Sequence, residues 1–207
     1  MFFGGRGGND PFQGFGGSGR QRGTTQIGND IEAEMPITLL EAYQGGSKTF
    51  GLNGEKLRID IRPGSYDGQR LRIKGKGDQG SHGGKRGDLY IVLNVLPDPR
   101  FRREGGNLVH TAKVDIYTAI LGGKVEIPTL TGTVNMTLPK GTDPGKTLRL
   151  KGKGMPKYGA KSFGDLLVKI EVALPKDLSA EEEELFSKLK SIRENKTVYQ
   201  NWTGNKK

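Results

Sequence analysis

The sequence repeats itself after 77 residues, and this repeat constrains the fold more than any other feature. Gly45–Gly46 falls on Gly122–Gly123, and Leu71–Gly77 falls on Leu148–Gly154, without a gap in the 207-residue chain. Gly87, Asp88 and Leu89 likewise fall on Gly164, Asp165 and Leu166. An internal repeat determines the architecture before any single residue does. Because this unit is longer than a solenoid repeat and occurs only twice, we expect two similar domains in tandem.

Apolar and polar residues alternate along much of each repeat, as in Ile31–Ile37 and Leu89–Val95. This period of two, bounded by Gly, Pro, Asn and Asp, indicates half-buried strands. A hydrophobic fraction of 32% and 34 glycines suit thin β-layers better than one thick core. Between strands, Leu39–Tyr43 is expected to form a short helical turn that stops at Gly45–Gly46. We therefore predict a mostly β fold of two tandem β-sandwich or barrel-like domains, followed by a C-terminal helix.

The C-terminal helix is predicted from its cap and its apolar stripe. Ser179 precedes Glu182 in a capping-box pattern, and Leu185, Leu189 and Ile192 recur on one side. That stripe needs one partner surface, which is either the second domain or the same helix of another subunit. The expected boundaries are a Gly/Phe-rich flexible linker over 1–28, a first β-domain over 29–99, a second over 100–176, a helix over 177–195 and a tail over 196–207.

The residue inventory argues against catalysis. The chain has no cysteine and only two histidines, His82 and His110, which lie far apart in sequence. No metal-ligand spacing or nucleophile motif occurs, and Lys74–Gly77 lacks the spacing of a phosphate-binding loop. Asp88 and Asp165 repeat together with turn glycines, which is typical of turn caps. We expect no enzyme activity, no metal and no cofactor.

The net charge of +10 favours acidic partners such as nucleic acid or an acidic peptide. However, the lysines and arginines are spread through turns without interleaved aromatics, so a solvated basic surface is the simpler interpretation. DNA binding is kept as the alternative function. No apolar run reaches the ~20 residues of a membrane span, so we expect a soluble, cytoplasmic protein without a membrane partner.

Binding of an extended peptide is the remaining hypothesis. Ala33 and Met35 share a strand face by parity, as do Phe50 and Leu52. If these strands are neighbours, their side chains could accept an apolar residue while a sheet edge supplies main-chain hydrogen bonds. The same residues could instead simply fill a small core. Parity does not separate the two interpretations.

The arrangement of motifs resembles a known family. A Gly/Phe-rich segment precedes two copies of the repeat, and the copies are joined by Pro97–Leu108, which reads PDPRFRREGGNL. With the terminal helix, this resembles the C-terminal substrate-binding region of zinc-free, CbpA-like DnaJ co-chaperones. The His-Pro-Asp tripeptide of the J-domain and a cysteine-rich zinc insertion are both absent. The chain is thus expected to be a fragment beginning in the Gly/Phe linker, or else a naturally J-less protein.

This resemblance implies a stress-response chaperone that binds hydrophobic segments of unfolded client polypeptides and delivers them to a DnaK-type chaperone. Some zinc-free relatives associate with DNA, which also keeps the alternative open. The resemblance implies a client groove formed by Ala33, Met35, Phe50, Leu52 and Ile91. Lys48 would help to hold the acidic C-terminal tail of the partner chaperone, although Gly51 stands where another basic residue can occur. The C-terminal helix would join a homodimer through Leu185, Phe186 and Leu189.

The two copies are not expected to be equal. The positions 77 residues after Met35, Phe50, Leu52 and Ile91 hold a smaller and partly polar set, namely Ala112, Ile127, Thr129 and Val168. We therefore expect the first copy to bind clients and the second mainly to separate it from the dimerisation helix.

Overall fold

The structure is a computed structural model that describes residues 25–52 and 54–194. Its contacts divide the chain into two compact units, one formed by residues up to 34 with 70–92 and the other by 35–69 with residues from 93 onward. The first and fifth strands run from one unit into the other. Most of the predicted linker and the tail, with Tyr199 and Trp202, lie outside the described residues. The predicted domain boundaries stay predictions.

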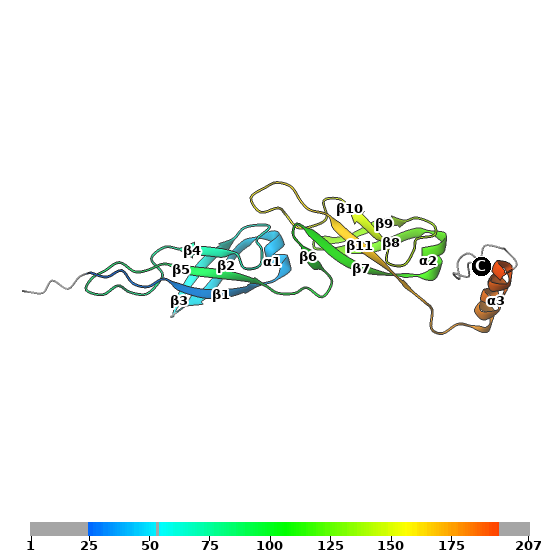
Figure 1. The fold of residues 1–207 in the computed structure, drawn as a ribbon, viewed down its shortest axis with the longest axis horizontal. Helices are drawn as coiled ribbons and strands as arrows, with labels where there is room; N and C mark the ends of the chain where they lie inside the picture. The colour runs from blue at the N-terminus through cyan, green and yellow to red at the C-terminus, as the bar shows by residue number, and fades with distance from the viewer. Residues whose placement is uncertain (1–24, 53, 195–207) are drawn as a thin grey trace, which may run out of the picture. The chain divides into compact units, whose positions relative to one another are not determined.

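The first repeat contributes five strands and one short helix, in the order shown in Figure 1. They form a three-stranded sheet in the order β1-β5-β4 and a separate hairpin, β2-β3. The bounds are β1 Ile31–Ile37, α1 Leu39–Gln44, β2 Gly46–Leu52, β3 Glu55–Ile61, β4 Arg70–Ile73 and β5 Leu89–Val95.

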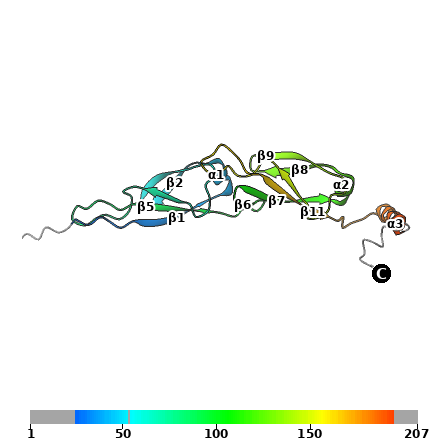
Figure 2. The same cartoon turned by 45° about the horizontal axis from the view of Figure 1, so that its top comes forward.

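The second repeat has the same plan with one added edge strand. Its sheet has the order β10-β11-β7-β6, and its hairpin is β8-β9, whose strands lie side by side in Figure 2. The bounds are β6 Arg102–Glu104, β7 Asn107–Asp115, α2 Ile116–Leu121, β8 Gly123–Thr129, β9 Gly132–Leu138, β10 Thr147–Leu150 and β11 Leu166–Ala173. The parallel pair β7-β11 brings Leu108 opposite Leu166. The predicted mostly β fold is confirmed.

The repeat recurs in hydrogen bonds as well as in strands. The Asp88 carboxylate accepts a hydrogen bond from the Gly75 amide at 2.8 Å. The Asp165 carboxylate accepts the equivalent bond from the Gly152 amide at 2.8 Å. Both aspartates therefore cap turns, as their repetition beside glycines predicted.

Each short helix begins and ends at equivalent residues. Thr38 forms a capping box with Glu41 at the start of α1, and Asp115 accepts the Thr118 amide at the start of α2. The helices end at Gly45 and Gly122, whose φ angles are 70° and 77°. These φ angles favour glycine. Helix α1 therefore ends at Gly45 as the sequence predicts, and α2 ends at the equivalent glycine, Gly122.

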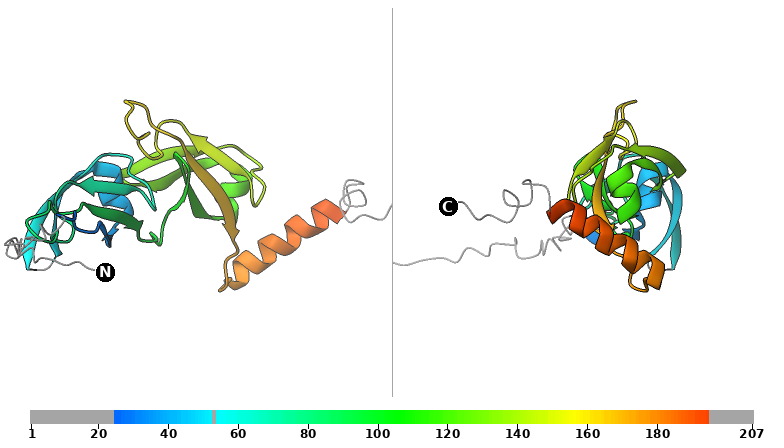
Figure 3. Two further views of the ribbon diagram at one scale, coloured as in Figure 1. Left: turned by 60° about the vertical axis from the view of Figure 1, so that its left-hand side comes forward. Right: turned by 90° about the vertical axis from the view of Figure 1, so that its right-hand side faces the viewer.

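The third helix, α3, spans Ala180–Glu194 and is one continuous helix in Figure 3. Its predicted capping box is present, because Ser179 Oγ accepts the Glu182 amide and Glu182 Oε2 accepts the Ser179 amide. None of its residues is buried. Among the helices of the described ranges, none has the length and apolar character needed to cross a membrane.

Candidate peptide-binding surface

The hairpin β2-β3 has one apolar face, and that face opens toward the turn. Its register pairs Lys48 with Ile59, Phe50 with Leu57 and Leu52 with Glu55. Near the base of the hairpin, Ile59 is only 4% exposed. Phe50, Leu52 and Leu57 are half-buried, so the apolar face is partly uncovered in the outer half of the hairpin.

The equivalent hairpin in the second repeat is buried at the positions of Phe50 and Leu52, although Val134, the counterpart of Leu57, is half-buried as Leu57 is. Ile127 occupies the position of Phe50 and is completely buried, and Thr129 occupies that of Leu52 and is 5% exposed. The Thr129 hydroxyl donates a hydrogen bond to the Gly132 carbonyl at 2.9 Å, inside its own turn. Leu130 is also buried beside it. The two copies therefore differ in exposure at the positions predicted to make them unequal.

Strand β2 also offers main-chain groups. Within the part of the chain that the structure describes, β2 pairs with β3 alone, which leaves its other edge unpaired. A side chain added at Gly51 would meet no atom within 4 Å, so the strand can be approached closely there. An unpaired edge of this kind is a template for another extended chain.

Lys48 lies on the apolar face of β2, and its ammonium group already forms an ion pair within the chain. Its ammonium group lies 2.9 Å from the Glu41 carboxylate and donates to the Pro36 carbonyl at 3.0 Å. The pKa of Glu41 is lowered, mainly by the Thr38 amide and then by Lys48. Lys48 therefore stabilises the start of α1, and binding of an outside carboxylate by Lys48 has to compete with Glu41.

The structure divides the predicted client-groove residues into two classes. Met35 and Ile91 are 2% and 0% exposed, whereas Ala33, Phe50 and Leu52 are half-buried. Phe50 and Leu52 lie together on one face of β2 with Lys48, in the same compact unit as Met35. Ala33 and Ile91 belong to the other unit.

The predicted dimerisation residues also differ from one another. Leu185 and Leu189 are 53% and 58% exposed. Phe186 is half-buried, with its ring centroid 6.2 Å from that of Tyr117 in α2. Only the two leucines therefore keep most of their side-chain surface available to another molecule.

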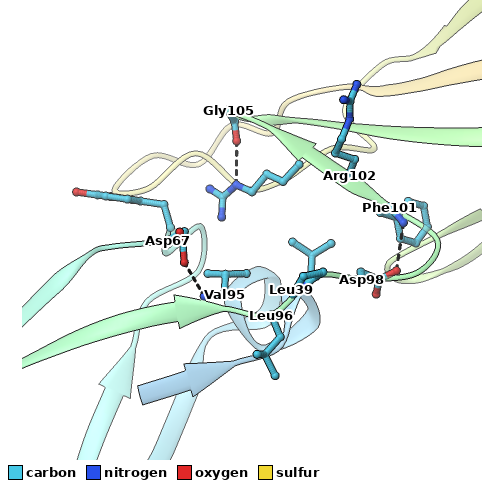
Figure 4. Close-up of a pocket in the computed structure, with 11 residues that line it drawn as sticks. Leu39, Asp67, Val95, Leu96, Asp98, Phe101, Arg102 and Gly105 are labelled. Carbon is cyan, nitrogen blue, oxygen red and sulfur yellow. Dashed lines mark hydrogen bonds between the residues drawn. The ribbon is translucent and has the colours of Figure 1, made fainter. Parts of the chain in front are cut away.

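The residue pattern did not reveal a cavity of about 670 Å³ beside the segment that joins the repeats. Figure 4 shows Leu39, Val95 and Leu96 on its apolar side. The Asp67 carboxylate accepts the Val95 amide at 2.8 Å, and Asp98 accepts the Phe101 amide at 3.2 Å. The sequence marks this region only through the motif Pro97–Leu108, whose residue pattern does not indicate a cavity.

Arg103 holds this joining segment through neutral groups. Its guanidinium donates to the carbonyls of Gly64, Ser65 and Gly105. Burial lowers the pKa of Arg103. At Gly64, an added Cβ would lie 2.5 Å from the Pro156 carbonyl oxygen. These close main-chain contacts indicate a structural joint and not a reactive site.

Comparisons with known proteins agree with the motifs. The family model described as the DnaJ C terminal domain matches residues 31–175. Chaperone protein DnaJ 2 of Thermus thermophilus is 41% identical over 84% of this chain and 60% of its own length. A DnaJ protein of Deinococcus proteolyticus is 36% identical over 89% of this chain and 58% of its own length. A DnaJ-like protein of Synechocystis is 40% identical over 88% of this chain and 53% of its own length.

The chain thus spans about 60% or less of the length of these relatives. Their names describe DnaJ chaperones or DnaJ-like proteins, and they give no support to the DNA-binding alternative.

Proposed function

The chain belongs to the DnaJ C-terminal domain family, and on that basis we propose that it is the polypeptide-binding region of a co-chaperone. It binds exposed hydrophobic segments of unfolded proteins and passes them to a DnaK-type chaperone. The first repeat is the binding repeat. The second repeat separates it from α3, which joins two copies.

The observation that carries this proposal is the difference between the two hairpins. The β2-β3 hairpin leaves Phe50 and Leu52 half-buried, whereas β8-β9 buries Ile127 and Thr129 almost completely. Apolar side chains that remain in contact with water contribute less to the stability of the free protein. A ligand that covers them removes this apolar surface from water, and that favours binding. Two apolar positions that are partly uncovered in one hairpin and buried in its repeated copy are therefore best explained by a ligand that covers them in the first.

The proposed mode of binding is strand addition. An extended client segment pairs with the free edge of β2, and its main-chain groups form hydrogen bonds that do not depend on sequence. Every second client side chain then points toward Phe50 and Leu52. A fully buried apolar side chain contributes roughly 1.5–3 kcal/mol, so one or two contacts give weak and reversible binding. Such affinity suits a protein that must release its client.

The fully buried residues of the predicted groove are not proposed to contact the client. We assign Phe50 and Leu52 to direct contact, and Met35 and Ile91 to the core because almost no surface remains on them. Ala33 keeps partial exposure and stays a candidate contact. This assignment narrows the larger set that the family resemblance implies.

Recognition of an acidic tail of the partner chaperone is the finer part of the proposal. Lys48 is the basic side chain on the apolar face of β2, and its ammonium group lies 2.9 Å from the Glu41 carboxylate. A ligand carboxylate that replaces Glu41 gains a charge-assisted hydrogen bond but leaves Glu41 to solvent. We therefore expect Lys48 to add little affinity to an acidic peptide unless an apolar residue binds next to it.

The test is a charge placed on the apolar face. Phe50→Asp should weaken binding of a fluorescent apolar peptide at least tenfold, measured by anisotropy, because a carboxylate cannot be covered by an apolar segment without a desolvation cost. Thr49→Asp is the matched control, since Thr49 is exposed on the opposite face of the same strand. If the Phe50 variant is folded and its anisotropy titration matches that of the native chain, the assignment of the groove is wrong.

A further inference from the structure

Residues 26–28, which we call the strap, lie along a loop of the first repeat, residues 78–87, which we call the holding loop. The Gly28 amide donates a hydrogen bond to the Lys85 carbonyl at 2.9 Å. Two residues earlier, Gln26 forms an isolated antiparallel β-bridge with the same loop. The strap and the holding loop belong to the same compact unit. The strap is therefore an added extended segment that precedes the first strand.

The strap and the holding loop meet through their main chains, at positions where only glycine fits. A Cβ added at Gly84 would lie 1.9 Å from the Gln26 carbonyl oxygen, and one added at Gly80 would lie 2.4 Å from that atom. On the strap, a Cβ added at Gly28 would lie 1.9 Å from the Asp78 carbonyl oxygen. Carbon atoms in contact lie about 3.5–4.0 Å apart, so none of these additions is tolerated. The three glycines therefore form a slot that accepts an extended main chain.

The corresponding loop of the second repeat differs at the same positions. Two lysines, Lys157 and Lys161, stand 77 residues after Gly80 and Gly84. A Cβ added at Gly105, the counterpart of the strap glycine, would meet no atom of the described residues within 4 Å. The glycines that line the slot are thus present in the repeat that has a strap and are replaced by lysines in the other.

The loop of the second repeat, residues 155–164, closes on itself. Its Ser162 carbonyl accepts a hydrogen bond from the Lys157 amide at 2.9 Å. Ser162 stands 77 residues after Lys85, whose carbonyl accepts instead from Gly28 of the strap. The same carbonyl position is therefore paired within the loop in one repeat and with the strap in the other. The repeated fold thus has two ways to complete this loop.

Exchange between these two arrangements gives up little burial. The Ile27 side chain, at the centre of the strap, is 73% exposed, so its release uncovers almost no apolar surface. The Lys85 carbonyl has a main-chain donor in either arrangement, so it is not left unpaired. The next hydrogen bond, from the Asp78 amide to the Asn29 carbonyl at 2.9 Å, has an equivalent in the second repeat. The exchange is therefore confined to the strap.

We propose that the holding loop is a clamp with two states: it either holds the strap, or closes on itself as the loop of the second repeat does and releases the strap. When the strap is held, the preceding Gly/Phe-rich residues are tethered at Gln26. When it is released, the tether moves to Asn29, which adds about 10 Å of extended chain at roughly 3.3 Å per residue. The clamp thereby sets how far the Gly/Phe-rich residues reach from the first repeat. It goes beyond the proposed function and depends neither on client binding nor on the dimer.

The test is amide hydrogen exchange of the full chain, followed for single residues by NMR. In the native chain the Gly28 amide should exchange more slowly than in an unstructured peptide, because it is hydrogen-bonded in the held strap. Gly84→Ala places a methyl group against the Gln26 carbonyl and should speed exchange at Gly28 at least tenfold. The double change Gly80→Lys with Gly84→Lys installs the residues of the second repeat and should have the same effect. Gln79→Ala is the control and should leave the exchange unchanged, since the Gln79 side chain is exposed in the same loop and the change adds no atom.

The Ile31 amide shows in the same spectra whether a variant has stayed folded. It donates to the Asp88 carbonyl at 2.9 Å, and in the second repeat the Leu108 amide donates to the Asp165 carbonyl at 3.0 Å, so this bond belongs to both loop arrangements. Exchange at Ile31 should therefore remain slow in the glycine variants. Exchange at Gly28 that is unprotected in the native chain, or unchanged in both variants, overturns the clamp. Equal acceleration at Gly28 and Ile31 also overturns it, because the strap would then open only together with the first sheet.

Discussion

At the scale of single residues, Phe50 and Ile127 occupy the same position of the repeat but are proposed to have different roles, ligand binding for Phe50 and fold stability for Ile127. The two side chains occupy equivalent places in their hairpins, but Phe50 is half-buried and Ile127 is completely buried. A buried side chain contributes its full transfer free energy and fills a volume that its neighbours cannot close. A half-buried side chain contributes less to the free energy of folding and keeps some of its surface available to a ligand. The same repeat position is therefore expected to serve the core in one copy and the ligand in the other.

This difference is measurable by truncation. Ile127→Ala should lower the free energy of unfolding by about 2–5 kcal/mol, as expected for a fully buried aliphatic side chain. Phe50→Ala should cost clearly less, although it removes more atoms, because part of the ring is already in contact with water. Urea denaturation of the two variants provides the comparison. A larger loss for Phe50→Ala than for Ile127→Ala would place Phe50 in the core and contradict its role as a contact.

Arg103 holds the joining segment through three hydrogen bonds to main-chain carbonyls. Its guanidinium donates to three main-chain carbonyls, those of Gly64, Ser65 and Gly105. Lysine offers one nitrogen and cannot reach three carbonyls with the same geometry. Arg103→Lys should therefore destabilise the fold by about 1–3 kcal/mol, the cost of part-buried acceptors left unpaired.

Arg102→Lys is the control for that substitution in thermal or urea unfolding. Arg102 is exposed and its ion pair with Glu104 is at the surface, where such pairs contribute about 0–1 kcal/mol. Equal losses for the two arginines would mean that the carbonyl contacts of Arg103 contribute nothing.

At the scale of elements, the N-cap of α2 makes the stability of the fold depend on pH. Asp115 begins α2, and the pKa of its carboxyl is lowered, first by the hydrogen bond from the Thr118 amide. A depressed folded-state pKa means that the stabilisation is present above the ordinary value of 3.8 and is lost as the pH falls through the folded value. Asp115→Ala should therefore cost about 1 kcal/mol at pH 7, the usual effect of an N-cap.

The stability of the native chain and of Asp115→Ala can also be compared at lower pH, which tests the direction of the pH dependence. The stability difference between the native chain and Asp115→Ala should shrink below pH 3.8, measured by urea denaturation at a series of pH values. A difference that stays constant from pH 7 to pH 3 would show that the charge of Asp115 has no part in capping α2.

The elements were predictable where local chemistry determines them. Ser179 predicted the start of α3, Gly45 predicted the end of α1, and the repeat predicted that Asp88 and Asp165 cap equivalent turns. Exposure was not predictable in this way, because it depends on what covers a side chain from distant parts of the chain. Alternation placed Met35 with Ala33 and Phe50 with Leu52, but it could not show that Met35 is buried while Phe50 is partly open.

The ion pair between Lys48 and Glu41 also could not be predicted from the sequence. Lys48 and Glu41 are seven residues apart and lie on different elements, β2 and α1. Their ion pair at 2.9 Å depends on how the helix turns the chain back toward the strand. Family resemblance pointed to a basic residue for an acidic tail, whereas the structure shows that this residue already has an acidic partner.

At the scale of the whole molecule, a homodimer changes how strongly a weak surface can hold a long client. Each copy offers one open hairpin, so two copies can bind two apolar segments of the same unfolded chain. The second binding event is then intramolecular, and its strength depends on the length of chain between the segments. No new contact is needed, and release of either segment remains fast. Weak contacts at Phe50 and Leu52 are therefore compatible with retention of an unfolded protein.

This can be tested with two identical apolar peptides joined by Gly/Ser linkers of increasing length. The joined peptide should bind the native chain 10²–10⁴-fold more tightly than the single peptide at the best linker length, and less tightly when the linker is shorter or much longer. Because such linkers span about 5–6 Å × √n, the optimum also reports the spacing of the two sites. Leu185→Asp, which should separate the copies, should reduce the affinity for the joined peptide to near that for the single one in isothermal titration calorimetry. An affinity that does not vary with linker length, or that survives dissociation of the dimer, would mean that one copy alone accounts for client binding.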